Sequence, residues 1–169
     1  MQAVLLDTSL ILDCAKRKID VFAGLDGLMD GAWEARASEG VMREMHAKAR
    51  IKGPKGAEAR LALAMLDAWR GKGAAGNEAQ EGDASRAGRE GSADDAARAD
   101  VAGNAAHEGT TRVRVIVEEN KSNVDGWLLA RGKELRAVVC TNDAKVRMRA
   151  RAAGLKVISV LHNSRLGYV

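Results

Sequence analysis

Short apolar runs alternate with helical repeats along the chain, apart from one long stretch in the middle. The apolar runs at 3–6 and 137–140 have the length of buried strands. Elsewhere, apolar residues recur three and four positions apart, as they do on one face of an amphipathic helix. This pattern predicts strands at 3–6, 33–37, 112–117, 137–140 and 155–161, and helices at 10–14, 21–29, 41–50, 57–69, 123–135 and 144–153.

Strands and helices in alternation are typical of a parallel sheet that helices cover on both faces. The fold class we expect is therefore α/β, with a doubly wound, mostly parallel central sheet flanked by helices. The length of 169 residues suits a single domain spanning residues 1–169. The strand at 155–161 is expected to be the last one.

The stretch at 71–110 differs in composition from the rest of the chain. Alanine and glycine supply half of its residues, and Val101 is its only large aliphatic side chain. A segment of this kind buries too little apolar area to offset the entropy of ordering the chain. We therefore expect a low-complexity, disordered insertion, with a marginal alanine-rich helix at 93–106 as the alternative.

Charge is distributed unevenly along the sequence. The chain has 27 basic and 23 acidic residues, of which 71–110 holds 4 and 8, so the remainder holds 23 and 15. That remainder carries a net charge of +8, which suits a polyanionic partner. A basic surface that binds no ligand is the simpler alternative.

The cysteines, histidines and hydropathy indicate a soluble protein of the cytoplasm. Cys14 and Cys140 lie in apolar surroundings and are interpreted as reduced core residues. His46, His107 and His162 are scattered, so a zinc site is not expected. No apolar run approaches the roughly 18 residues of a membrane span, and the first residues lack the basic start of a secretory leader. We therefore expect a cytoplasmic location and no membrane partner.

Carboxylates fall at the junctions between predicted strands and helices. Asp7 and Asp143 follow two of the strands, and Asp125 lies at the start of the helix that leads into one of them. The carboxyl ends of parallel strands meet at one edge of a sheet, where ligand crevices form. Glu44 borders the apolar face of its helix, so we expect it to be partly buried near the same edge.

Helix capping is the simpler explanation for each aspartate taken singly. Carboxylates at helix starts accept hydrogen bonds from free backbone N–H groups, and Ser122 with Asp125 fits a capping box. Capping does not explain why several acids should gather at one edge of a basic chain. Together they suit a hard divalent cation, Mg²⁺ or Mn²⁺, which prefers oxygen ligands and neutralises their mutual repulsion.

A basic helix follows Asp143. Its cationic residues are Lys145, Arg147, Arg149 and Arg151. Because the apolar stripe of this helix is expected to run through Val146, Ala150 and Ala153, the cations fan out along its exposed sides. They form either a solubilising surface or a set of phosphate contacts that do not depend on base sequence.

The three tryptophans have two interpretations. Trp33, Trp69 and Trp127 could stack on nucleic-acid bases, but core positions are more common for such residues. For Trp69 the core interpretation is the stronger one, because it continues a helical stripe with Leu61 and Met65.

Four segments resemble the motifs of PIN-domain ribonucleases in their order along the chain: AVLLDTSLIL, VMREM, NVDGWLLA and VVCTNDAKVRMRARAAGLKVISV. The resemblance covers nearly the whole chain outside 71–110. It is closest to a small archaeal branch that is similar to the rRNA-processing PIN proteins of small-subunit ribosome assembly, and more distantly to VapC toxins. It implies a PIN-like fold and metal-dependent hydrolysis of RNA phosphodiester bonds.

The resemblance also implies roles for individual residues. Four acids match the catalytic metal ligands by motif position, namely Asp7, Glu44, Asp125 and Asp143. Four polar residues match those that surround the metal, namely Thr8, Ser9, Thr141 and Asn142. The implied cofactor is Mg²⁺ or Mn²⁺. The chain departs from the related rRNA-processing proteins at Gly126, where they usually carry a second acid.

Three functions remain open at this stage. The first is an endoribonuclease that processes rRNA precursors or acts as a VapC-type toxin. The second is a catalytically degenerate PIN domain that binds RNA or ribosome-assembly factors, and the third is a nuclease directed at DNA. The expected partners are RNA, a second copy of the chain as in many relatives, and either assembly factors or an antitoxin.

Overall fold

The computed structural model describes residues 1–74, 115–120 and 123–169, without the side chains of 69–74. Its strands are β1 (Gln2–Leu6), β2 (Trp33–Ser38), β3 (Val115–Glu118), β4 (Val138–Cys140), β5 (Val157–Val160) and β6 (Leu166–Tyr168). Its helices are α1 (Thr8–Arg17), α2 (Val21–Asp26), α3 (Glu39–Ala49), α4 (Pro54–Ala74), α5 (Val124–Leu135) and α6 (Ala144–Ala152).

The strands form one sheet in the order β3-β2-β1-β4-β5-β6. The first five strands pair in parallel, and β6 pairs antiparallel with β5. The chain moves outward from β1 through β2 to β3, then returns past β1 to β4, β5 and β6. Strand order therefore reverses between β1 and β4. In open parallel sheets, ligands bind beyond the carboxyl ends of the strands at such a reversal.

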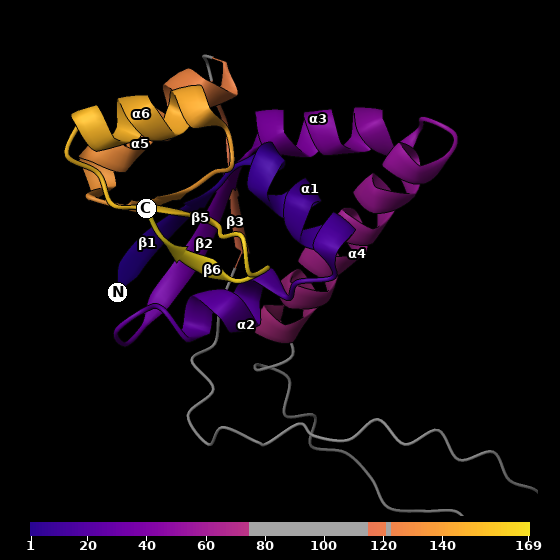
Figure 1. Ribbon diagram of the computed structural model, residues 1–169, viewed down its shortest axis with the longest axis horizontal. Helices are drawn as coiled ribbons and strands as arrows, with labels where there is room; N and C mark the ends of the chain where they lie inside the picture. The colour runs from indigo at the N-terminus through magenta and orange to yellow at the C-terminus, as the bar shows by residue number, and fades with distance from the viewer. Residues whose placement is uncertain (75–114, 121–122) are drawn as a thin grey trace, which may run out of the picture.

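Helices cover both faces of this sheet (Figure 1). On one face α1, α3 and α4 pack against one another, and on the other face α5 packs against α6. The core lies between these layers, and its largest fully buried side chains include Trp33, Phe22, Leu5 and Met45. The structure thus confirms the predicted α/β fold with a doubly wound, mostly parallel sheet.

Some predicted boundaries are wrong. Strand β6 was not expected, because three residues are too few to show an alternating pattern, so the predicted strand at 155–161 is not the last one. Helix α4 extends to Ala74 and therefore includes the first residues of the predicted insertion at 71–110. The rest of that insertion, with the alternative helix at 93–106, lies outside the described residues.

The buried face of α4 also differs from the prediction. Ala59, Ala62 and Leu66 are fully buried, whereas Leu61 is 46% exposed. The helix is apolar on more than one side, so spacing alone did not identify the face that packs on α1 and α3. The side chain of Trp69 lies outside the described part of the structure.

A network of ion pairs fastens β2 and the edge strand β3 to α5. Arg36 on β2 pairs with Glu34 and Glu118, and Arg131 on α5 contacts Glu118 at 2.8 Å. Burial alone would raise the pKa of Glu118, but hydrogen bonds from Arg131 and Arg36 outweigh it and lower that pKa. The network thereby holds α5, which carries Asp125, against the sheet.

The two cysteines lie in the core, as predicted. Both are free and buried, and burial raises the pKa of the Cys14 thiol to about 12. None of the helices in the described ranges is both long enough and apolar enough to cross a lipid bilayer.

Candidate metal-dependent active site

The four predicted acids line one cavity at the carboxyl edge of the sheet. This cavity has a volume of about 250 Å³, and Asp7, Glu44, Asp125 and Asp143 all contribute to its wall. Asp7 directly follows β1 and Asp143 follows β4, the two strands between which strand order reverses. The topology therefore brings to one place acids that are far apart in the sequence.

Asp7 is the buried member of the group. Its backbone N–H donates to the carbonyl of Cys140 at 3.0 Å, which fixes the exit of β1 against β4. Its Oδ2 accepts hydrogen bonds from the hydroxyls of Ser9 at 2.5 Å and Thr141 at 2.6 Å. Its side chain caps no backbone N–H group of α1, so the capping interpretation is wrong for this aspartate.

Burial raises the pKa of Asp7. Hydrogen bonds from Ser9 and Thr141 act in the opposite direction, while the negative charge of Asp125 raises the pKa further. The net shift is upward, so the protein groups around Asp7 disfavour its ionised carboxylate. A cation in the cavity would remove this penalty, because it favours the charged form.

Asp143 and Asp125 have different local roles. Asp143 is a genuine cap, since its Oδ1 accepts the N–H groups of Lys145 at 2.7 Å and Val146 at 3.1 Å. Asn123, rather than Asp125, caps α5 by accepting the N–H of Gly126 at 2.7 Å. The predicted capping-box serine lies outside the described residues. Asp125 stands in the first turn of α5, and its carboxylate is not needed as the cap.

Glu44 is exposed, so the prediction of partial burial is wrong. It borders the apolar face of α3, but that border opens onto the cavity and solvent. Lys48 lies one helical turn further along and lines the same cavity. Lys48 belongs to a cationic stretch of the sequence, with Arg43 and Arg50, whose position relative to the acids the sequence alone left open.

The residues present are compatible with a hydrated divalent ion. Within the described ranges, no three acidic, histidine or cysteine side chains stand close enough together to enclose an ion. Mg²⁺, however, usually keeps several of its waters and takes only one or two carboxylates. The hydroxyl of Thr8, which also lines the cavity, is buried and has no hydrogen-bond partner among the described residues. Water around an ion would satisfy it.

Asn142 lies beside the acidic cavity and faces away from it. Its backbone N–H donates to Ser9 Oγ at 3.0 Å, and its side chain donates to Asp13 Oδ2 at 2.7 Å. The same side chain accepts from Ser159 Oγ at 2.7 Å and from the backbone N–H of Val160 at 2.9 Å. Asn142 therefore joins β4, β5 and α1 and holds the loop that carries Asp143.

The predicted RNA-binding residues of α6 divide into two groups. Arg147 and Arg151 line a second cavity of about 670 Å³, which also includes Ser9 and Asn142. Lys145 and Arg149 are exposed and line neither this cavity nor the acidic one. The predicted apolar stripe is largely correct, because Val146 and Ala150 are buried and Ala153 is half-buried.

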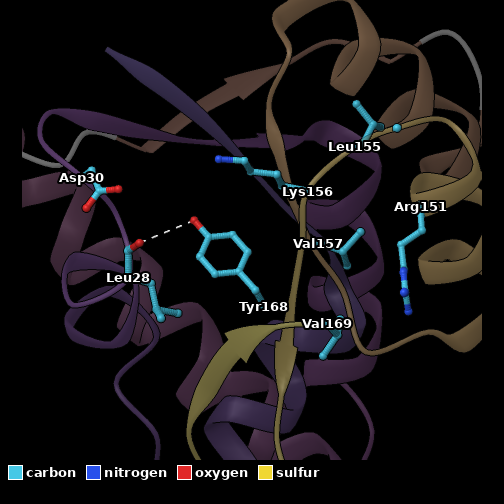
Figure 2. Close-up of a pocket in the computed structure, with 9 residues that line it drawn as sticks. Leu28, Asp30, Arg151, Leu155, Lys156, Val157, Tyr168 and Val169 are labelled. Atoms are coloured by element: carbon cyan, nitrogen blue, oxygen red, sulfur yellow. Dashed lines mark hydrogen bonds between the residues drawn. The ribbon is translucent and has the colours of Figure 1, made fainter.

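A third cavity, of about 520 Å³, lies beside β5 and β6. Figure 2 shows Tyr168 in this cavity, where its hydroxyl donates to the carbonyl of Leu28 at 3.4 Å. None of the four predicted acids lines it.

Base stacking on tryptophan has no support in the described residues, because Trp33 and Trp127 are 1% and 7% exposed and belong to the core.

Comparison with known proteins identifies the architecture. No protein-family model matches the sequence, and a search of curated proteins finds no match. The fold is similar to a solved structure described as that of the PIN domain endonuclease Utp24, with a TM-score of 0.58. The two chains are 19% identical, and the match covers 98% of this chain and 90% of the other. At this level of identity the likeness establishes the fold alone: the chain has a PIN-like α/β fold.

Proposed function

We propose that the protein is a metal-dependent endoribonuclease that uses Mg²⁺ or Mn²⁺. The observation that carries this proposal is the cavity at the reversal of strand order. Four acids contribute to its wall, from the residue after β1, from α3, from α5 and from the loop after β4. A basic cavity stands next to it, so one edge of the sheet offers sites for a cation and for a polyanion.

Each residue then has a defined task. Asp7 and Asp143 would hold the ion, with Asp125 and Glu44 contributing directly or through water. When bound, the ion supplies positive charge that activates a water and stabilises the leaving oxygen of the phosphodiester. Ser9 and Thr141 orient the Asp7 carboxylate through its Oδ2. Lys48 places a positive charge at the cavity wall, where it can attract the RNA backbone.

Cleavage of RNA should require a divalent ion. We expect the purified protein to cut a structured RNA internally with Mn²⁺ or Mg²⁺, and to lose this activity in EDTA because the acids alone activate no water. Gel analysis of a uniformly labelled RNA checks this, with precursor rRNA as the first substrate because of the sequence resemblance. A DNA of the same sequence tests the DNA-directed alternative.

The same assay separates the non-catalytic alternative. RNA that is bound but left intact with every divalent ion would support an RNA-binding or ribosome-assembly scaffold and contradict the nuclease proposal. Gly126 keeps this alternative relevant, because it removes the second acid that the resemblance leads one to expect. Growth arrest on expression, relieved by a co-encoded inhibitor, is the result expected for a toxin.

A further inference from the structure

The 670 Å³ cavity has the composition of an anion site. It contains three arginines, Arg17, Arg147 and Arg151, and one acid, Asp13. Asp13 is already neutralised, because its Oδ2 accepts from Arg17 Nε at 2.9 Å and from Asn142 at 2.7 Å. The charge left over in the cavity is therefore positive and comes from two residues of α6.

Those two residues are free to bind a ligand. Arg147 donates from Nη1 to Ser159 Oγ at 3.2 Å, and among the described residues no carboxylate pairs with Arg147 or Arg151. They lie one helical turn apart, so both guanidinium groups project from the same side of α6. Two unpaired guanidinium groups on one wall match the geometry and charge of a phosphate.

The basic cavity adjoins the acidic one at a shared residue, Ser9. Ser9 lines both cavities, and its hydroxyl bonds to Asp7 on one side while accepting the N–H of Asn142 on the other. Asn142 lines the basic cavity, and the next residue, Asp143, lines the acidic one. A strand whose phosphodiester lay against the acids would therefore carry a neighbouring nucleotide into the arginines.

We propose that this basic cavity is a phosphate-binding subsite, in which Arg147 and Arg151 hold a phosphate group of the RNA strand next to the bond that is cut. This inference rests on the proposed function. The volume of the cavity is larger than a phosphate requires and admits a whole nucleotide. The phosphate is either an internal one or the terminal one of a short RNA, and the two sources can be separated by experiment.

Binding of RNA in EDTA tests the subsite without any cleavage. Fluorescence anisotropy with a short single-stranded RNA should show affinity about five- to tenfold lower for Arg147→Gln and for Arg151→Gln. Each variant should also reduce the slope of log affinity against log salt by about 0.7. Arg147→Lys should recover part of the loss because it keeps the charge.

The matched control is Arg136→Gln, at the opposite edge of the sheet, which should bind RNA as the wild type does. Melting temperatures identify any variant that binds weakly because it is unfolded. If removing the 5′-phosphate of the RNA lowers its affinity for the wild type but not for the Arg147/Arg151 double variant, the subsite holds a terminal phosphate. Equal binding of both RNAs, with arginine dependence retained, supports an internal one.

Two results would overturn the subsite, and neither depends on activity. The first is that both arginine variants bind RNA with the affinity of the wild type. The second is that they lose no more affinity than Arg149→Gln does, because Arg149 lies on the same helix but outside the cavity. Arginine-dependent binding by a protein that cuts no RNA would instead remove the nuclease proposal and leave the subsite standing.

Discussion

Replacing Asp7 by asparagine is expected to lower RNA cleavage by about 10³-fold while making the folded protein more stable at neutral pH. The loss of activity follows from the proposed function, because Asp7 is the one buried carboxylate among the described residues and would hold the ion. Asparagine keeps an oxygen that can accept the hydrogen bonds of Ser9 and Thr141, so the local geometry should survive. Residues that serve a function often lower the stability of the folded protein, and we expect Asp7 to do so through its buried charge.

The sign of the stability change follows from the pKa of Asp7. Its pKa is raised in the folded protein above the ordinary value of 3.8, mainly by burial. Between these two pKa values the folded state keeps a proton that the unfolded state loses, so the free energy of unfolding falls as the pH rises. At every pH above the folded-state pKa, the folded protein bears the whole free-energy cost of burying the ionised Asp7 carboxylate. Asp7→Asn removes it, so the free energy of unfolding at pH 7 should be higher in the variant than in the wild type.

Thermal melts as a function of pH measure this difference. The melting curves of wild type and Asp7→Asn should coincide near pH 3.5 and separate as the pH rises, in a buffer that contains EDTA. In a second set of melts without EDTA, added Mn²⁺ should stabilise the wild type and leave the variant unchanged, because only a folded state that binds the ion gains from it. A variant that melts lower than wild type at pH 7 would show that the Asp7 carboxylate is structural.

Asp143 should distinguish metal binding from helix capping. Asparagine caps a helix about as well as aspartate does, so Asp143→Asn should keep the hydrogen bonds to Lys145 and Val146 and the stability of wild type. Asp143→Ala loses the cap and should unfold with about 1 kcal/mol less free energy. Both variants lose the negative charge, so cleavage should fall by about 10²-fold or more in each.

Chemical denaturation and RNA cleavage measured on the same preparations give both numbers. Wild-type activity in Asp143→Asn, with reduced activity only in Asp143→Ala, would mean that this aspartate serves as a cap and contributes nothing to the chemistry. Loss of activity in both, with loss of stability in one, assigns Asp143 both roles.

The sequence was sufficient for the architecture and for the meeting point of the acids. Apolar and alternating segments located five of the six strands of the sheet, all except β6. A parallel sheet then places the residues that follow β1 and β4 on one edge, whatever the details of packing. That rule alone put Asp7 and Asp143 together. The rule depends on the topology of the backbone and on no side-chain conformation, so it applies even to residues as far apart in the sequence as Asp7 and Asp143.

Features that depend on tertiary packing could not be predicted from the sequence pattern. Glu44 borders an apolar stripe, but whether that border is covered depends on neighbouring elements that periodicity does not describe. Asn142 matched the polar residues around a metal, yet its hydrogen bonds to Asp13 and Ser159 turn it toward the basic cavity. Asp13 lies one helical turn after Ser9, so its proximity to the site was the one part of this network that spacing could have indicated.

The most direct test of the central claim is anomalous diffraction from a crystal of the wild-type protein soaked in Mn²⁺. The account predicts a peak in the acidic cavity, in direct contact with a carboxylate oxygen of Asp7 and joined to Asp143 directly or through one water. A cavity without manganese in a soaked crystal, or an ion bound only at other carboxylates, would contradict it.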